Sequence, residues 1–284
     1  MKHVGIIGLP VAHSLSPRMQ QAAFDICGIE ARYSLWATEA DHLPARIASL
    51  RTSEVLGANV TIPYKTDVVP LIDECDPLAA QVGAINTIVN YDGRLIGYNT
   101  DVPGFMQALI ENTERPFGCC GKNAIIIGTG GAARAAAVGL LKGGAAELTL
   151  LGRTEAHLAA LLQHLQKLAA TLDAPTQLQA LSLENPDIGR ALSRADLLVN
   201  ATPVGLHKND SRILIDVEAQ PPSALVMDMI FNPPCTPLLR AAQARGCAVL
   251  NGLTMLLYQG ALAFELWTGL TAPVEAMRSV LERS

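Results

Sequence analysis

Short apolar runs alternate with stretches of helical periodicity along the whole chain. In the first third, these patterns predict strands at residues 4–8, 33–36, 57–61 and 84–90, and helices at 17–26 and 42–49. A tight turn at 91–94 then leads to a predicted antiparallel strand at 95–99 and a helix at 102–111. This alternation favours a mostly parallel sheet covered by helices.

The polar stretch at residues 113–122, which contains Pro116 and two glycines, is the candidate domain boundary. Beyond it, strands are predicted at 124–127, 147–151, 177–180, 197–199, 224–228 and 248–250, alternating with helical segments. Helices predicted at 255–267 and 273–282 are expected to cross back onto the first domain. The predicted fold class is α/β, with a mostly parallel N-terminal domain and a Rossmann-like, doubly wound second domain.

Composition narrows the function classes. The 284 residues are 50% hydrophobic and 17% charged, with a net charge of −5, so neither nucleic acid nor an anionic membrane is an expected partner. The six cysteines include no C-x-x-C pair and no zinc-like spacing, which indicates reduced thiols and no metal site. The first ten residues lack the features of a signal peptide, and residues 124–141, interrupted by Arg134, are no membrane span. We therefore expect a cytoplasmic protein that binds small molecules.

A glycine-rich turn follows the apolar strand at 124–127 and opens an alanine-rich helix. Gly128, Gly130 and Ala133 match G-x-G-x-x-A, in which the glycines allow a tight turn and close approach of a pyrophosphate. The helix N-terminus, with Gly131 and Ala132, offers free N–H groups to the phosphates. The motif predicts a dinucleotide site; the alternative is a turn that binds nothing.

The choice of dinucleotide is expected at the end of the second strand of this domain, where an acidic residue would bind the ribose of NAD. Here the strand ends in Gly152, Arg153 and Thr154. A guanidinium suits the 2′-phosphate of NADP, so NADP is favoured. Glu155 nearby keeps NAD possible, and Arg153 as a solvated surface residue is the alternative.

Several polar segments of the first domain lie where packing alone would not place them. They are HSLSP at 13–17, NVTIPYK at 59–65, GAINT at 83–87 and GYNTD at 97–101. The chain here resembles the shikimate dehydrogenase family, which carries H-S-x-S-P, N-V-T-x-P-x-K, G-A-x-N-T and G-x-N-T-D in this order. The resemblance continues through the glycine-rich turn and the segments at 200–206, 228–233 and 251–261.

The resemblance implies reduction of a 3-keto group on a cyclohexene carboxylate, with Lys65 and Asp101 as the catalytic pair. Chemistry independently favours such a pair, because a positioned donor stabilises the charge that grows on the ketone oxygen and supplies its proton. Taken singly, Lys65 also fits a solvated loop lysine, and Asp101 also fits a helix N-cap.

The family pattern assigns further roles. It implies that Ser14 and Ser16 bind the substrate carboxylate, unless they form an ST-turn or helix cap. Ring-hydroxyl ligands would be Thr61, Asn86 and Gln259, with Thr202 and Gly252 at the cofactor. Gln259 interrupts an apolar helix, where a buried amide must find partners. The alternative for Gln259 is a core glutamine whose hydrogen bonds are satisfied within the protein. The alternative for Asn59 and Asn86 is that they are structural amides that bridge loops.

Three features depart from the family pattern. Gln20 and Gln21 replace the usual His-Asn after S-P-x-x, and Phe231 replaces a tyrosine expected near the substrate carboxylate. At the adenosine end, Gly152 replaces an asparagine, and His157 occupies a position where a second basic residue is common. These departures leave the substrate contacts and the cofactor preference open.

The resemblance thus implies an NADP-preferring shikimate dehydrogenase that interconverts 3-dehydroshikimate and shikimate, as a monomer or homodimer. Residues 1–101, completed by helices in 252–284, would bind substrate, residues 115–250 would bind cofactor, and the active site is expected in the cleft between them. Rivals are an NAD-dependent quinate/shikimate dehydrogenase, an enzyme of an aminated analogue, and a methylene-tetrahydrofolate dehydrogenase-like enzyme. A non-catalytic dinucleotide sensor is disfavoured because Lys65 and Asp101 are both present.

Overall fold

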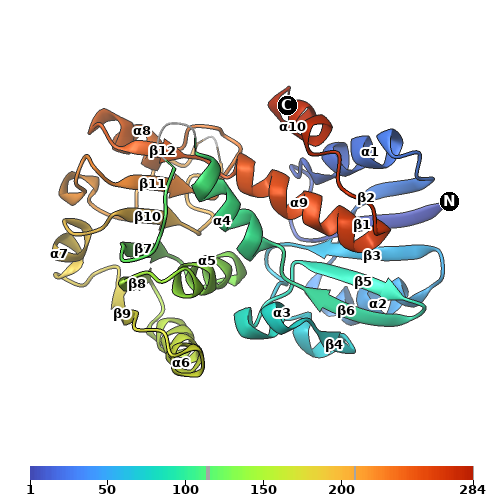
Figure 1. Cartoon of the computed structure of the whole chain (residues 1–284), viewed down its shortest axis with the longest axis horizontal. Helices are drawn as coiled ribbons and strands as arrows, with labels where there is room; N and C mark the ends of the chain where they lie inside the picture. Colours follow the sequence, from blue (N-terminus) through green and yellow to red (C-terminus); the bar gives the residue numbers. More distant parts are fainter. Residues whose placement is uncertain (113–115, 208, 284) are drawn as a thin grey trace. The chain divides into compact units, whose positions relative to one another are not determined.

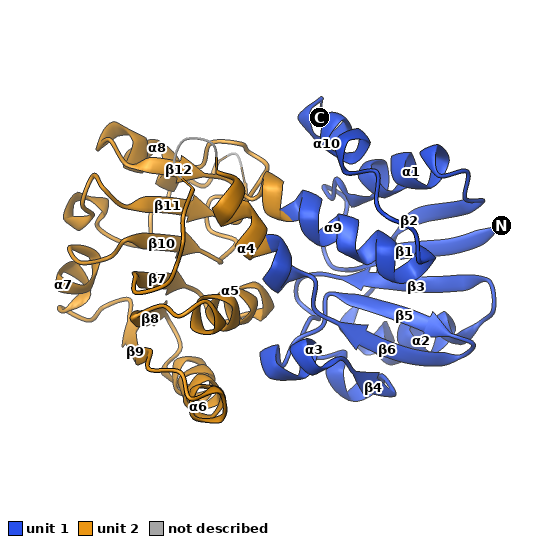
Figure 2. Cartoon of the chain, viewed as in Figure 1, with its two compact units in different colours: residues 1–104, 256–284 blue, residues 105–255 orange. Residues whose placement is uncertain are grey.

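The computed structural model describes residues 1–112, 116–207 and 209–283 (Figure 1). The chain divides into two compact units, residues 1–104 with 256–284, and residues 105–255 (Figure 2). Each unit holds one six-stranded sheet with helices packed on it, which confirms the predicted α/β class. The expected boundary at 113–122, including residue 115, lies partly outside the described residues. The division between the units falls within helix α4 (Asp101–Glu111).

The sheet of the first unit mixes parallel and antiparallel neighbours. Its order is β2-β1-β3-β5-β6-β4. The strands are β1 (Lys2–Gly8), β2 (Ala31–Ala37), β3 (Val55–Val60), β4 (Glu74–Cys75), β5 (Thr87–Tyr91) and β6 (Arg94–Tyr98). Strand β1 runs parallel to β2 and β3, and β4 runs parallel to β6, whereas β5 is antiparallel to both β3 and β6.

Two details of this sheet differ from the sequence-based prediction. The strand expected at 84–90 begins only at Thr87, because the Ile85 N–H donates to the Lys65 carbonyl at 2.7 Å instead of joining the ladder. Strand β4 was not predicted, since two residues carry no readable periodicity. The first difference matters for the site, because it ties the loop before β5 to the backbone of Lys65.

Helices cover both faces of the first sheet. They are α1 (Ser16–Ile26), α2 (Leu43–Ala48), α3 (Pro77–Val82), α9 (Leu253–Thr268) and α10 (Val274–Glu282), with 3₁₀ helices at Ala40–His42, Ser49–Arg51 and Val69–Leu71. One core cluster joins α2 residues such as Ile47 to strand residues such as Ile88.

Helix α9 is anchored to this unit by aromatic side chains. The Phe264 ring packs on Phe24 of α1 at a centroid distance of 5.5 Å, and the Trp267 Nε1–H donates to the Ile88 carbonyl at 3.0 Å. Gly57 permits that approach, because a Cβ there would lie 2.0 Å from the Ile88 carbonyl oxygen. The C-terminal helices therefore pack on the first unit.

The sheet of the second unit is entirely parallel. Its order is β12-β11-β10-β7-β8-β9. The strands are β7 (Asn123–Ile127), β8 (Glu147–Gly152), β9 (Gln177–Ser182), β10 (Leu197–Asn200), β11 (Leu225–Asp228) and β12 (Ala248–Leu250). This is the doubly wound dinucleotide-binding order, in which the direction of winding reverses between β7 and β10. Ligands bind such sheets at the carboxyl ends of the strands.

The helices of the second unit follow their strands closely. They are α5 (Gly131–Lys142), α6 (Glu155–Leu172), α7 (Ile188–Leu192) and α8 (Pro237–Ala244), with a 3₁₀ helix at Val217–Ala219. Helix α5 packs against β7 and β8 through small residues such as Ala133 and Ala136, which are fully buried. A second core cluster lies beneath α7 and α8. No helix of the described part is long and apolar enough to cross a membrane.

Candidate active site

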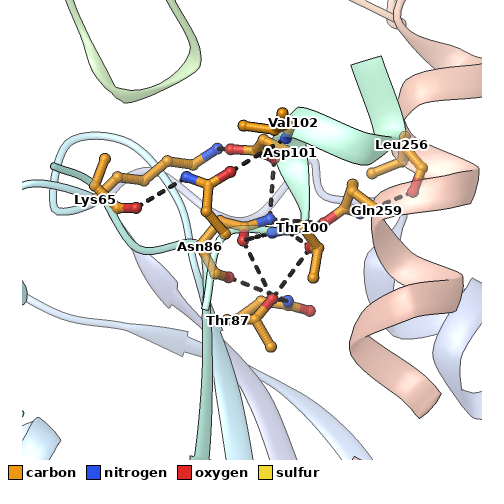
Figure 3. A network of polar contacts seen from close by, with 11 residues as sticks. Lys65, Asn86, Thr87, Thr100, Asp101, Val102, Leu256 and Gln259 are labelled. Carbon is orange, nitrogen blue, oxygen red and sulfur yellow. Dashed lines mark hydrogen bonds and ion pairs between the residues drawn. The ribbon is translucent and has the colours of Figure 1, made fainter. Parts of the chain in front are cut away.

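The predicted catalytic pair is brought together in the first unit. Lys65 follows β3 in a turn, and Asp101 is the first residue of α4 (Figure 3). The Lys65 Nζ donates to Asp101 Oδ2 at 2.5 Å, and the two side chains are only 15% and 5% exposed. Lys65 is therefore not the solvated loop lysine that was the alternative interpretation.

The second oxygen of Asp101 is also engaged. Asn86 Nδ2 donates to Asp101 Oδ1 at 3.0 Å (Figure 3). Capping of α4 is done by Asn99, whose Oδ1 accepts from the Val102 N–H at 3.2 Å. Asp101 is thus held between an ammonium and an amide, which leaves its carboxylate oriented toward Lys65.

Asn86 is the centre of a buried polar network. Its Nδ2 also donates to Thr100 Oγ1 at 2.8 Å and to Gln259 Oε1 at 3.3 Å, and its Oδ1 accepts from the Thr100 N–H at 2.7 Å. Gln259 in turn donates to the Leu256 carbonyl at 2.7 Å. Asn86 is only 2% exposed. The side-chain amides of Asn86 and Gln259 therefore have protein partners, as the alternative interpretation expected. Asn86 also contacts Asp101 directly.

A chain of hydrogen bonds extends from this network to Tyr33. The Tyr33 hydroxyl donates to Asn59 Oδ1 at 2.7 Å, and Asn59 Nδ2 donates to Thr87 Oγ1 at 3.1 Å. Burial raises the pKa of Tyr33 well above its usual value, so the hydroxyl stays a donor. Sequence reasoning missed Tyr33, because it was read only as part of an apolar strand.

Ser14 and Thr61, two further predicted ligands, are half-buried. The Ser14 hydroxyl oxygen accepts from the Ser16 N–H at 3.2 Å, so the foreseen ST-turn does form. Thr61 follows directly after β3, and its hydroxyl bonds no other described residue. Both hydroxyls retain the capacity to donate to a ligand.

The two glutamines that depart from the family pattern have structural contacts. Gln20 Nε2 donates to the Gly260 carbonyl of α9 at 2.8 Å. Gln21 Nε2 donates to the Ala31 carbonyl at 3.1 Å, and its Oε1 accepts from the Tyr33 N–H at 3.1 Å. Both side chains therefore fasten α1 to neighbouring elements.

In the second unit, the glycine-rich turn has the shape that a dinucleotide requires. Gly128 has φ = +123°, and a Cβ there would lie 3.0 Å from the Ala201 carbonyl oxygen. Gly130 is the N-cap of α5, and a Cβ there would meet nothing within 4 Å, so space is open above the turn. The first N–H groups of α5, at Gly131, Ala132 and Ala133, have no partner within the helix and suit a phosphate.

The residues predicted to contact the adenosine end of the cofactor lie at the end of β8 and directly after it. Gly152 is buried, and a Cβ there would lie 3.2 Å from Leu158 and 3.3 Å from Thr129 of the glycine-rich turn. Arg153 and Thr154 are exposed at the start of α6, as is His157. The Arg153 guanidinium bonds no other residue of the described chain and is therefore available to an anion.

The carboxyl ends of β10, β11 and β12 form one connected cluster. Thr202 donates through Oγ1 to Asn200 Oδ1 at 2.7 Å, and Asn200 Nδ2 donates to Asp228 Oδ1 at 3.1 Å. Burial raises the pKa of Asp228 above its usual value, although its hydrogen bonds oppose that shift. A Cβ at Gly252 would lie 2.0 Å from the Met229 carbonyl oxygen, so the backbones touch there. The cluster holds the segment that leads to the half-buried Phe231.

No group of three or more His, Cys, Asp or Glu side chains among the described residues could hold a metal ion. The side chains of Lys65 and Asp101 can donate a proton and stabilise a developing charge.

Comparisons with known proteins identify the family of the chain. The family model for the shikimate dehydrogenase substrate binding domain matches residues 6–88, and that for the shikimate 5′-dehydrogenase C-terminal domain matches residues 252–282. The chain is 41% identical over 282 residues to shikimate dehydrogenase (NADP(+)) of Desulforamulus reducens, covering 98% of this chain and 94% of that protein.

Solved structures are similar over the whole chain. The shikimate 5-dehydrogenase of Thermus thermophilus, solved with NADP(H) and shikimate, is 36% identical with a TM-score of 0.85, covering 100% of this chain and 99% of that one. A quinate dehydrogenase of Corynebacterium glutamicum, solved with NAD, is 29% identical with a TM-score of 0.88, covering 100% and 99%. Because the chain is 41% identical to the Desulforamulus reducens enzyme over nearly its full length, it belongs to the shikimate dehydrogenase family.

Proposed function

We propose that this protein is an NADP-dependent shikimate dehydrogenase, which reversibly reduces 3-dehydroshikimate to shikimate in aromatic amino-acid biosynthesis. The observation that carries the proposal is the Lys65–Asp101 ion pair, which is largely shielded from solvent and is fastened by Asn86. Family membership supports the same reaction, since the curated relative is named for shikimate and NADP.

The residues of the first unit account for the proton chemistry. As the ketone carbon is reduced, negative charge grows on its oxygen, and the Lys65 ammonium stabilises that charge and supplies the proton. Asp101 keeps Nζ in place through the 2.5 Å contact, and Asn86 keeps Asp101 in place. In the reverse direction, the same lysine takes the proton from the shikimate hydroxyl as hydride leaves the carbon.

Substrate recognition is proposed to use the remaining polar groups around this pair. Ser14 and Ser16 would donate to the carboxylate, and Thr61, Asn86 and Gln259 would bind ring hydroxyls. The hydrogen bond from Asn86 Nδ2 to Gln259 Oε1, 3.3 Å long, supports this arrangement, because it joins two of the proposed ring-hydroxyl ligands. Residues 1–101 with helices in 252–284 would therefore form the substrate domain.

The second unit, proposed as the cofactor domain over residues 115–250, fits a dinucleotide phosphate. Open space above Gly130 and the unpaired N–H groups of α5 suit the pyrophosphate. Bound there, NADPH would supply the hydride. Gly152, Arg153 and Thr154 would contact the adenosine end, while Thr202 and Gly252 belong to the segments at the carboxyl ends of the neighbouring strands.

A matrix of substrates and cofactors tests the proposal. Purified protein is expected to generate absorbance at 340 nm with shikimate and NADP, and more slowly with NAD or quinate. A preference for quinate with NAD would favour the alternative, an NAD-dependent quinate/shikimate dehydrogenase. The similarity to a quinate dehydrogenase solved with NAD is the reason to test this alternative. Equal activity on simple aliphatic 2-hydroxy acids would contradict the proposal.

Replacing Phe231 with tyrosine is expected to lower KM for shikimate by about tenfold, because a hydrogen bond to a charged group is worth about 1.5–3 kcal/mol. The family pattern places a tyrosine hydroxyl near the carboxylate at this position. The turnover number kcat should change less, since that contact exists in ground and transition states alike. Steady-state kinetics of Phe231→Tyr measure both values. An unchanged or higher KM would mean that Phe231 packs against an apolar surface instead.

Two further expectations stay predictions, namely a cytoplasmic location and a monomeric or homodimeric state. All six cysteines are free thiols, which agrees with a reducing compartment.

A further inference from the structure

The contact between helices α1 and α9 includes one buried polar side chain. Gln20 is completely buried, and its Nε2 donates to the Gly260 carbonyl at 2.8 Å. Gly260 lets the helices come this close, because a Cβ there would lie 2.1 Å from Met19 Cε and 3.2 Å from Gln20 Nε2. The amide therefore lies at the closest part of this contact.

The other end of the same amide is unsatisfied. Gln20 Oε1 is shielded from solvent and has no hydrogen-bond partner among the described residues. A buried carbonyl oxygen without a donor destabilises a fold, so an apolar side chain of the same length would serve packing better. One turn further along α1, Phe24 fills the equivalent position by packing on Phe264. Packing alone thus does not explain a glutamine at position 20.

The position of Gln20 relative to the proposed substrate ligands offers an explanation. Ser16 lies one turn earlier on the same face of α1, four residues before Gln20. Gln259 directly precedes Gly260 in α9. The hydrogen bond from Gln20 therefore joins the helix that carries a proposed carboxylate ligand to the helix that carries a proposed ring-hydroxyl ligand.

We propose that Gln20 is a positioning residue for shikimate: its bond to the Gly260 carbonyl sets the register of α1 against α9, and thereby the spacing between Ser16 and Gln259. The inference rests on the proposed function, in which those two residues bind substrate. A hydrophobic contact tolerates sliding of one helix along the other, whereas a directional hydrogen bond specifies one register. The unpaired Gln20 Oε1 lowers the stability of the fold, and we infer that this loss is tolerated because the hydrogen bond fixes the register.

The test is Gln20→Met, which keeps the length and helix propensity of the side chain but removes the donor. We expect KM for shikimate to rise roughly fivefold, the effect of one hydrogen bond, with kcat and KM for NADP within about twofold of wild type. The melting temperature should stay the same or rise, because the unpaired oxygen is gone. A rise in KM of less than threefold would overturn the proposal.

Two further variants separate positioning from packing. Phe24→Leu, at the same helix contact, is expected to lower the melting temperature and leave KM for shikimate within about twofold of wild type. Gln20→His restores a side-chain N–H and should return KM to within about twofold of wild type. If the histidine variant instead matches Gln20→Met, the hydrogen bond is not the cause and the proposal fails.

A double-mutant cycle locates the effect. If Gln20 acts through the placement of Ser16, Gln20→Met should raise KM much less in a Ser16→Ala background than in wild type. Additive effects would contradict action through Ser16. Wild-type activity on shikimate is measured first: its absence would refute the proposed function and this inference with it, whereas normal activity with an unaffected Gln20→Met variant would refute the inference alone.

Discussion

Lys65→Met is expected to lower kcat for shikimate oxidation by roughly two to four orders of magnitude, the usual contribution of a positioned acid–base group. Methionine keeps the length of the side chain but carries neither the charge nor the proton that the substrate oxygen exchanges. Asp101 would also lose its 2.5 Å partner, while Asn86 would still hold its other oxygen. Because Lys65 lies in the first unit, the Kd for NADP, measured by calorimetry, should be nearly unchanged.

Lys167→Met is a matched control for this variant. Lys167 is an exposed lysine of α6, so the same change of side chain there should leave kcat at the wild-type value. If Lys65→Met retained full kcat, Lys65 would have no part in the proton transfer. A loss of NADP affinity equal to the loss of kcat would indicate instead that the substitution disturbed the fold.

Arg153→Ala is expected to reduce kcat/KM with NADP by about 10- to 100-fold, because a charge-assisted hydrogen bond is worth about 1.5–3 kcal/mol. The value with NAD should change by less than about threefold, since NAD has no 2′-phosphate for the guanidinium to bind. The exposed guanidinium bonds no other described residue, so its removal should not lower the melting temperature. Kinetics with both dinucleotides measure the effect.

Arg190→Ala provides the comparison, because Arg190 is an exposed arginine of α7 in the same unit. Arg190→Ala removes one positive charge from the second unit, as Arg153→Ala does. If Arg153 acts through a local contact, Arg190→Ala should change kcat/KM with NADP and with NAD by less than about twofold. Equal losses with NADP and NAD in Arg153→Ala, or a wild-type preference for NAD, would show that residues 152–154 do not determine cofactor choice.

Local patterns in the sequence were sufficient for the second unit. Parallel strands buried on both faces produce continuous apolar runs. The predicted ends of β7 and β8 therefore lie within one residue of the observed ends. The glycines at 128 and 130 indicated the turn between β7 and α5. Lys65 and Asp101 could also be paired, but only through the ordered motifs of a known family. The two residues are 36 positions apart, and spacing along the chain does not show that Lys65 Nζ lies 2.5 Å from Asp101 Oδ2.

Only the tertiary structure decided how the polar residues of the first unit divide their work. Gln20 and Gln21 departed from the family pattern with no contact evident in the sequence, yet each bonds a backbone group of another element. Tyr33 looked like an ordinary strand residue, yet its hydroxyl donates to Asn59 of another strand. The late start of β5 likewise depends on a bond to Lys65, far away in the chain. The physical reason is common to all of them: apolar periodicity reports which face of an element is buried, whereas the partner of a buried polar atom is supplied by a distant segment and is known only once the chain has folded.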